Sequence, residues 1–325
     1  MRQPYESLSE QERIERLELL ARKALAIYGL DDADLRYVEP ATNVIFEVRG
    51  RRGGHYVLRI CESGRDEASL QREMLWLTSL RRFSNLGVPE PIIMQTGEFV
   101  RTVAMEGVPG RRPCMLFEWV DGTFVDKKLT PDHMRRVGRF VGELHRQSER
   151  FRWPDEWAPP PWTAPSLVSR VDRELESRGI DPGIVAHIQM ELERLAEMPS
   201  AVGVIHGAFR PEHVLFHEDE VRAIDFETCS IAPYLEDLVT FCDGVAGRDN
   251  ERELREALFA GYQSVRSLPE RFERVTAALR VSQRLVALGG HLSWVHHPPE
   301  DSRRGAIETE IGQVRALIAA IDGLP

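Results

Sequence analysis

The densest group of residues able to do chemistry lies between Val204 and Asp225. An apolar strand that ends at Ile205 is followed by the octad His206-Gly-Ala-Phe-Arg-Pro-Glu-His213. A short strand over 214–216, a turn and a second strand over 221–225 then lead to Asp225. Phosphoryl transfer needs a loop that presents a base to the acceptor hydroxyl, a metal ligand a few residues later, and an acidic metal ligand at the end of a neighbouring strand. The spacing of this segment supplies these three positions.

The elements that must position this segment begin with a helix and an antiparallel hairpin. Ser9 and Glu12 form a capping-box pattern, and apolar residues then recur at helical spacing. Alternating residues over 44–48, a glycine-containing turn over 50–54 and a second β-run over 56–60 predict the hairpin. The chain therefore opens with a small β-rich part.

After the hairpin, a helix and further extended segments are predicted, and the chain becomes mostly helical after about residue 122. Helical spacing over 70–80 is followed by extended segments that end in the continuous apolar run 115–120, which is typical of a buried strand. A third helix is predicted from Thr130. The segment 151–165 is too rich in proline and tryptophan for a helix and predicts a long loop. From Glu251 the pattern is helical, with predicted breaks at 268–269 and 296–299. The fold class is therefore α+β.

Composition narrows the class of protein. The 325 residues are 42% hydrophobic and 29% charged, which is typical of a globular chain and excludes fibrous, collagen-like and wholly disordered proteins. The formal net charge of −10 disfavours binding to nucleic acid or to an anionic membrane, and favours cationic small molecules as partners. No stretch approaches roughly 20 apolar residues. The cysteines form no paired pattern, which fits a cytoplasmic location; they are Cys61, Cys114, Cys229 and Cys242.

The octad resembles the catalytic loop His-x-Asp-x-x-x-x-Asn of the aminoglycoside phosphotransferase, choline kinase and homoserine kinase group, whose members share the protein-kinase-like fold. Ile224-Asp-Phe226, followed by Pro233 and Glu236-Asp-Leu238, is similar to that group's Ile-Asp-Phe and Asp-Leu segment. The resemblance implies that Asp237 accepts backbone N–H bonds from the catalytic loop.

Further matches extend the resemblance over most of the chain. Residues 56–60 look like the third strand of the small lobe, Glu73 stands where the helix glutamate is expected, and 117–120 looks like the hinge. The resemblance implies a bilobal fold, with a nucleotide-binding lobe over 1–118 and a helical lobe over 119–325. The second lobe would hold the catalytic loop, the metal site and the acceptor pocket.

The base position departs from the family. Ala208 stands where the family has its catalytic aspartate. A methyl group can neither accept the proton of an incoming hydroxyl nor orient it, so general-base help from this position is absent. Three accounts stay open: a replacement made to trap a substrate complex, a pseudokinase, or slow transfer that relies on positioning and charge neutralisation.

The metal position departs as well. Asp225 is expected to chelate the cation that bridges the nucleotide phosphates, which the resemblance implies is Mg²⁺. His213 stands where the family has asparagine, the second metal ligand. Because Mg²⁺ prefers hard oxygen ligands, an imidazole here binds it less well or favours Mn²⁺ or zinc.

Two arginines are candidates for contacts with phosphate. Arg59 replaces the lysine that usually contacts the α- and β-phosphates, and its planar fork can hold phosphate and pair with Glu73. Only three of the 42 basic residues are lysines, so arginine replaces lysine throughout this sequence. We therefore expect the change at position 59 to preserve phosphate binding. Arg210, two residues after the base position, is the candidate for neutralising charge at the γ-phosphate, with a surface role as the alternative.

The remaining candidates follow from the resemblance. His206 is expected to brace the catalytic loop. Glu118 and Val120 would offer backbone groups to the adenine of ATP, and Thr42 and Asn43 would lie in the loop over the phosphates.

The implied activity is transfer of the γ-phosphoryl group of ATP to a hydroxyl of a small molecule. An amine-bearing acceptor (aminoglycoside, amino alcohol or hydroxy-amino acid) fits the acidic residues Glu227, Glu236 and Asp243 near the metal-binding strand. The rival hypothesis is a catalytically dead nucleotide-binding protein with a regulatory or scaffold role. A protein kinase is disfavoured, because no Ala-Pro-Glu segment or extended activation loop follows Asp225.

Overall fold

The computed structural model divides the chain into two compact units. The first unit comprises Met1–Val125, Phe151–Ala158 and Glu212–Cys229, and the second comprises Asp126–Arg150, Pro159–Pro211 and Ser230–Pro325. The structure describes residues 5–40, 43–125, 128–165, 175–176, 182–198, 201–293 and 300–321.

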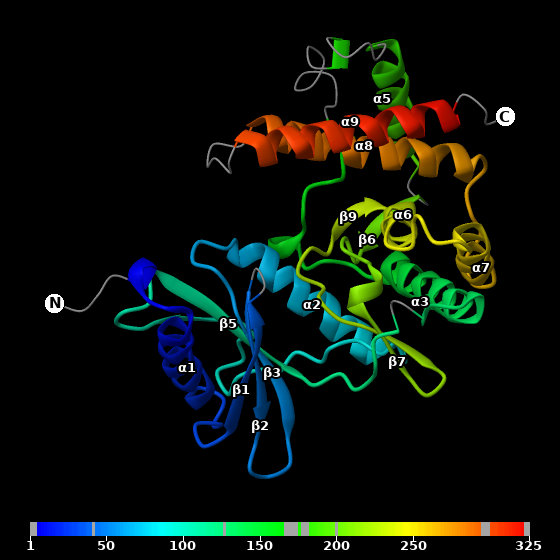
Figure 1. Cartoon of the computed structure of the whole chain (residues 1–325). Helices are drawn as coiled ribbons and strands as arrows, with labels where there is room; N and C mark the ends of the chain where they lie inside the picture. The colour runs from blue at the N-terminus through cyan, green and yellow to red at the C-terminus, as the bar shows by residue number, and fades with distance from the viewer. Residues whose placement is uncertain are drawn as a thin grey trace. The chain divides into compact units, whose positions relative to one another are not determined.

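A five-stranded antiparallel sheet forms the centre of the first unit (Figure 1). The predicted hairpin is confirmed, since residues 44–49 pair with 55–60 in continuous register. The buried strand ending at Glu118 pairs next to the hairpin, with Arg59 opposite Met115. In sheet order the strands are β1 (Asp34–Pro40), β2 (Val44–Arg49), β3 (His55–Ile60), β5 (Arg111–Glu118) and β4 (Arg101–Ala104).

The opening helix α1 (Glu10–Ala26) contributes one face of the core of this unit. Its predicted capping box is present, because the side chain of Ser9 accepts from the N–H of Glu12 and the side chain of Glu12 accepts from the N–H of Ser9. Buried side chains of α1 belong to one apolar cluster with the sheet residues Phe46 and Leu58. Burial of this stripe, rather than the cap alone, stabilises the helix.

Strand β1 was not predicted from the sequence. Its pairing with β2 shifts register between Tyr37 and Glu39, so one extra residue interrupts the alternation of inward and outward side chains. Such a bulge removes the period-two pattern on which strand prediction depends.

Two further elements complete the first unit. Helix α2 (Glu67–Phe83) is capped by Asp66, whose carboxylate accepts from the N–H groups of Ala68 and Ser69. Strands β7 (Val214–His217) and β8 (Glu220–Ala223) form a separate two-stranded hairpin. The predicted helix over 70–80 and the predicted strands after the octad are thereby confirmed.

The second unit is built mainly from helices. Helices α3 (Pro131–Arg150) and α7 (Glu251–Gln263) pack closely, because a Cβ atom at Gly138 would lie 2.0 Å from the carbonyl oxygen of Leu258. Figure 1 shows α8 and α9 side by side. The other elements are strands β6 (Val202–Ile205) and β9 (Ser230–Pro233), which pair with each other, and helices α5 (Pro182–Ala196), α6 (Leu235–Asp243), α8 (Phe272–Ser293) and α9 (Glu300–Ile321).

Helix α5 was also missed by sequence reasoning. The segment 151–165 is a loop with one short 3-10 helix at Asp155–Trp157, as its prolines predicted. Thr42 and the predicted break over 296–299 lie outside the described residues. Within the described part of the chain, every helix is too short or too polar to cross a bilayer.

Candidate functional site

A buried ion pair joins strand β3 to helix α2 in the first unit. Arg59 Nη1 donates to Glu73 Oε1 at 2.9 Å, and Nη2 donates to Oε2, so the two side chains meet as parallel forks. Arg59 is 5% exposed and Glu73 is 1% exposed. Burial raises the pKa of Glu73, although the charge of Arg59 acts to lower it. Burial alone would lower the pKa of Arg59, but the Glu73 carboxylate raises it overall, so the guanidinium stays cationic.

The fork leaves one donor of Arg59 without a partner. Its Nε is buried and forms no hydrogen bond within the described residues. An unsatisfied buried donor costs about 1–3 kcal/mol, and an anionic oxygen would remove that cost. Arg59 therefore fits a phosphate ligand while still bonded to Glu73.

Asp225 and His213 approach each other beside the β7–β8 hairpin. His213 Nε2 lies 3.4 Å from Asp225 Oδ2, and the N–H of Ile224 donates to the carbonyl of His213 at 2.9 Å. Asp225 follows the end of β8 with a φ of 65°, a left-handed conformation that aspartate tolerates better than most residues. Both side chains are partly exposed. The pair thus presents one hard oxygen ligand and one imidazole nitrogen.

The donor set fits a divalent cation that takes its other ligands from phosphate and water. No group of three or more His, Cys, Asp or Glu side chains with metal-binding spacing occurs among the described residues. Nucleotide-bound cations need few protein ligands, because phosphate oxygens and water supply most of the shell. Asp225 with His213 is therefore compatible with such a cation, and the imidazole shifts the preference away from Mg²⁺.

Asn43 is held beside the segment that follows Asp225. Its Nδ2 donates to Glu227 Oε2, and Arg65 Nη2 lies 3.7 Å from the same oxygen. Asn43 is 5% exposed, and its Oδ1 has no hydrogen-bond partner within the described part of the chain. Asn43, Glu227, Asp225 and Arg59 all lie in the first unit.

The hinge candidates differ in what their backbone can offer. The N–H of Glu118 donates to the carbonyl of Glu90 at 2.9 Å, so it is not available to an adenine ring. The N–H of Val120 makes no backbone hydrogen bond within the described residues. Between them, Trp119 stacks on His55 with ring centroids 4.3 Å apart, which fixes this segment against the sheet.

Residues 206–211 of the octad lie in the second unit, where hydrogen bonds to the backbone hold them. Asp237 Oδ2 accepts from the N–H of His206 at 2.9 Å, and Oδ1 accepts from the N–H of Gly207 at 3.0 Å, as the resemblance implied. The N–H of Ala208 donates back to His206 Nδ1 at 3.3 Å. Because Gly207 has a φ of 85°, the chain turns sharply here and brings the position of Ala208 partly to the surface.

Aromatic packing anchors the other side of this loop. Phe209 is fully buried, with its ring 6.1 Å from that of Phe140 and 5.3 Å from that of Phe241. His206 is fully buried against the edge of Phe209, in keeping with a bracing role. Arg210, the next residue, is exposed.

A hydrogen-bonded chain that sequence reasoning missed extends behind Asp237. His145 Nε2 lies 3.0 Å from Asp237 Oδ2, and His145 Nδ1 lies 3.1 Å from the hydroxyl of Tyr262. Arg266 Nη1 donates to the same hydroxyl at 2.9 Å. From these contacts we assign a neutral His145, whose Nε2–H donates a hydrogen bond to Asp237 and whose Nδ1 accepts a hydrogen bond from the hydroxyl of Tyr262.

Burial and hydrogen bonding together set the protonation states of His145 and Asp237. Burial lowers the pKa of His145, which keeps the ring neutral. Burial acts to raise the pKa of Asp237, but the hydrogen bonds from His145 and from the His206 backbone lower it overall. One sequence signal could have identified His145 as a buried residue: it lies four positions after Val141, on the same buried face of α3.

The acidic residues expected around an amine are mostly engaged. Asp243 accepts from Arg280 at 2.8 Å and from Arg284 at 2.9 Å, so its charge is neutralised. Glu227 contacts Asn43, as described above. Burial raises the pKa of Glu236 to about 7, with the neighbouring Asp237 adding to the shift. Glu236 can therefore lose or gain a proton near neutrality.

Comparison with known proteins agrees with this architecture. Residues 36–277 match the family described as the phosphotransferase enzyme family. A homoserine kinase of Sinorhizobium medicae (strain WSM419) is 28% identical over 230 residues, which is 66% of this chain and 65% of that protein. The chain thus spans just under two thirds of the length of that relative.

Two solved structures resemble the chain over nearly its whole length. A microcompartment-associated aminopropanol kinase is 25% identical, with a TM-score of 0.73 and coverage of 95% of this chain and 99% of that one. An amicoumacin kinase in complex with AMP-PNP, Ca²⁺ and Ami is 15% identical, also with a TM-score of 0.73, and the match covers 95% and 96% of the two chains. The α+β, protein-kinase-like fold predicted from the sequence is confirmed.

Proposed function

Because the chain belongs to the phosphotransferase enzyme family, we propose that it transfers the γ-phosphoryl group of ATP to a hydroxyl of a small amine-bearing molecule. Homoserine and aminopropanol, for which two of its relatives are named, each carry an amine and a hydroxyl. The observation that carries the proposal is the Arg59–Glu73 fork with its unpartnered, buried Nε, in a chain that matches this family over 36–277.

The residues of the first unit supply the contacts that a nucleotide needs. Arg59 would bind the phosphates through Nε while Glu73 fixes its orientation. Asp225 and His213 would hold the divalent cation, which supplies neutralisation of phosphate charge. The N–H of Val120, which makes no backbone hydrogen bond within the described residues, would donate to the adenine, and Asn43 would lie near the phosphates. Mn²⁺ is expected to serve at least as well as Mg²⁺.

The second unit supplies the acceptor side of the reaction. The backbone of the loop is fixed by Asp237, but the side chain at 208 cannot take up a proton. Transfer would therefore depend on alignment and charge neutralisation, to which the exposed Arg210 would contribute. General-base help is typically worth about 10²–10⁴-fold, so the chain is expected to be slow by this factor.

Ala208 also favours a second candidate function, a nucleotide-binding protein without activity. An Ala208→Asp variant separates the two. ATP consumption and acceptor phosphorylation by both proteins would be followed by ³¹P NMR, with homoserine and aminopropanol as acceptors and with Mg²⁺ or Mn²⁺. Ala246→Asp, which adds the same charge at an exposed alanine, is the matched control.

Three outcomes decide between the hypotheses. Slow transfer by the parent chain that rises about 10²–10⁴-fold in Ala208→Asp, with no change in the control, supports the kinase. Silence in both proteins, with thermal stabilisation by ATP and a divalent cation, supports the inactive nucleotide-binding protein. Absence of nucleotide stabilisation with either cation contradicts both.

The role of His213 is tested by binding rather than by activity. His213→Asn replaces the imidazole nitrogen with an amide oxygen, which Mg²⁺ prefers. Mn²⁺ bound with ATP should give nitrogen hyperfine coupling in EPR spectra of the parent chain and lose it in the variant. The same coupling in both proteins would remove His213 from the metal site.

A further inference from the structure

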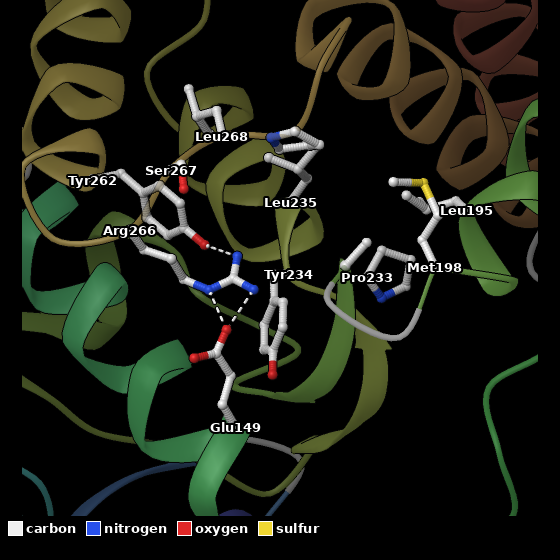
Figure 2. Close-up of a pocket in the computed structure, with 12 residues that line it drawn as sticks. Glu149, Leu195, Met198, Pro233, Tyr234, Leu235, Tyr262, Arg266, Ser267 and Leu268 are labelled. Carbon is white, nitrogen blue, oxygen red and sulfur yellow. Dashed lines mark hydrogen bonds and ion pairs between the residues drawn. The ribbon is translucent and has the colours of Figure 1, made fainter.

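A cavity of about 250 Å³ opens in the second unit, between the ends of α3 and α5, strand β9 and the segment after α7 (Figure 2). None of the residues predicted for nucleotide, metal or catalysis lines it. Most of its wall is apolar, as in sites for small organic molecules. The apolar lining includes Leu195, Met198, Pro233, Leu235 and Leu268.

One charged side chain of the lining is firmly held. The guanidinium of Arg266 lies 4.2 Å from the centroid of the Tyr234 ring, and Nη1 donates to Tyr262 at 2.9 Å. Its side chain is 13% exposed. Burial acts to lower the pKa of Arg266, but Tyr262 and Glu149 raise it overall, so the cation persists.

The Nε–Nη2 edge of the Arg266 guanidinium is bonded to a residue at the surface. Nε and Nη2 donate to Glu149 at 2.9 and 2.8 Å, and both bonds end on the single oxygen Oε1, as Figure 2 shows. The side chain of Glu149 is 44% exposed. A carboxylate that faces this edge squarely can use both of its oxygens, which is the stronger arrangement. Glu149 therefore satisfies Arg266 in a weaker geometry than the edge allows.

We propose that this cavity binds a small amphipathic carboxylate, whose carboxylate takes the place of Glu149 on the Nε–Nη2 edge of Arg266 and whose apolar body fills the space toward Met198. The exchange replaces one carboxylate on this edge with another, so Arg266 keeps an anionic partner, and the side chain that it releases, Glu149, is already 44% exposed. The contacts of Arg266 with Tyr262 and Tyr234 stay in place during the exchange.

Size and charge narrow the ligand class. The volume is below the roughly 300–1,000 Å³ of sites for drug-sized ligands, which favours a compact acid with one ring or one branched chain. An amine would meet the fixed charge of Arg266. A neutral ligand would fill the apolar part but would gain nothing from the guanidinium.

The test measures binding to the full chain without nucleotide, so its outcome is independent of the proposed kinase activity. Phenylacetate is the probe, and phenylacetamide is its uncharged counterpart. Affinity would be measured by calorimetry, and the site would be located by the methyl resonance of Met198 in protein labelled with ¹³C-methyl methionine. The expected results are preference for the acid over the amide by at least about tenfold, since a hydrogen-bonded charge contributes that much or more, and a shift of the Met198 resonance.

Three variants separate this site from a merely structural ion pair. Glu149→Gln removes the competing charge and should tighten phenylacetate binding about two- to fivefold. Arg266→Gln should weaken binding at least about tenfold. Met198→Trp enlarges a side chain of the lining and leaves the polar contacts of Arg266 intact, and it should abolish binding. Met190→Trp, at a similarly exposed methionine of α5 that does not line the cavity, should not.

The proposal is overturned by any of four results. These are equal affinity for acid and amide, no binding at about 10 mM probe, weaker binding in Glu149→Gln, or binding that survives Met198→Trp. Because Met198 lies outside the hydrogen-bonded chain of Arg266, the last result stands even if Arg266→Gln fails to fold.

Discussion

Replacing Asp237 with asparagine tests whether its carboxylate holds the loop that carries Ala208. The carboxylate accepts three hydrogen bonds, from His145 Nε2 and from the N–H groups of His206 and Gly207. Asparagine has the same shape but only one acceptor oxygen. With that oxygen toward His145 and His206, the amide N–H₂ faces the N–H of Gly207. The reverse orientation leaves His206 without an acceptor, even if His145 changes tautomer.

The expected cost follows from these contacts. At least one backbone N–H is left unsatisfied, at about 1–3 kcal/mol, and the remaining bonds lose the charge that strengthens them. Removing one partner of a buried charged network costs about 3–5 kcal/mol, and we expect the free energy of unfolding to fall by that amount in Asp237→Asn.

The assay combines urea unfolding with hydrogen exchange. Because two units need not unfold together, exchange of a peptide covering 202–212 would be measured by mass spectrometry beside the global transition. Asp249→Asn, at an exposed site, is the control. A variant within about 1 kcal/mol of the parent chain, with unchanged protection of this peptide, would refute the assignment of Asp237 as the support of the loop.

Three other substitutions probe buried charges by their dependence on pH. Glu236 has a folded pKa of about 7 against an ordinary 4.5, so its contribution to stability is lost as pH rises through 7, and Glu236→Gln should stabilise the chain by up to about 3 kcal/mol at pH 8 and not at pH 4.5. Arg59→Met strands the Glu73 carboxylate at a cost of about 3–5 kcal/mol at pH 8, and the cost should shrink as pH falls, because burial already raises the pKa of Glu73. Burial lowers the pKa of His145, so the unfolded chain binds the proton first and stability should fall as pH drops below about 6.5, a slope that His145→Gln should remove. Thermal unfolding across pH 4.5–8 measures all three, and parallel pH curves for variant and parent would contradict each.

Local patterns predicted the elements whose signals lie within one stretch of chain. The capping box at Ser9 and the hairpin over 44–60 depend on residues a few positions apart, and both were found. Strand β1 was missed because its bulge breaks the alternation, and no such local signal identified α5.

The candidate site shows the same division. Arg59, Glu73 and Asp225 could be named because they stand at fixed places in recognisable segments. The contact of His145 with Asp237 joins residues 92 positions apart, and the local sequence around either residue gives no indication of the other. The neutralisation of Asp243 by Arg280 and Arg284 likewise depends on how α6 packs on α8, and so the sequence overstated the acidic charge near an acceptor.

The loop around Ala208 also separates stability from catalysis. Its conformation is fixed by backbone N–H groups bonded to Asp237 and by the packing of Phe209, and the side chain at 208 contributes to neither. An alanine there can leave the loop in place while it removes the base. Ala208→Asp should therefore change turnover with little change in unfolding free energy, whereas Asp237→Asn should lower stability first. If both variants changed stability equally, the loop would be held through position 208, and the distinction between support and chemistry at this site would fail.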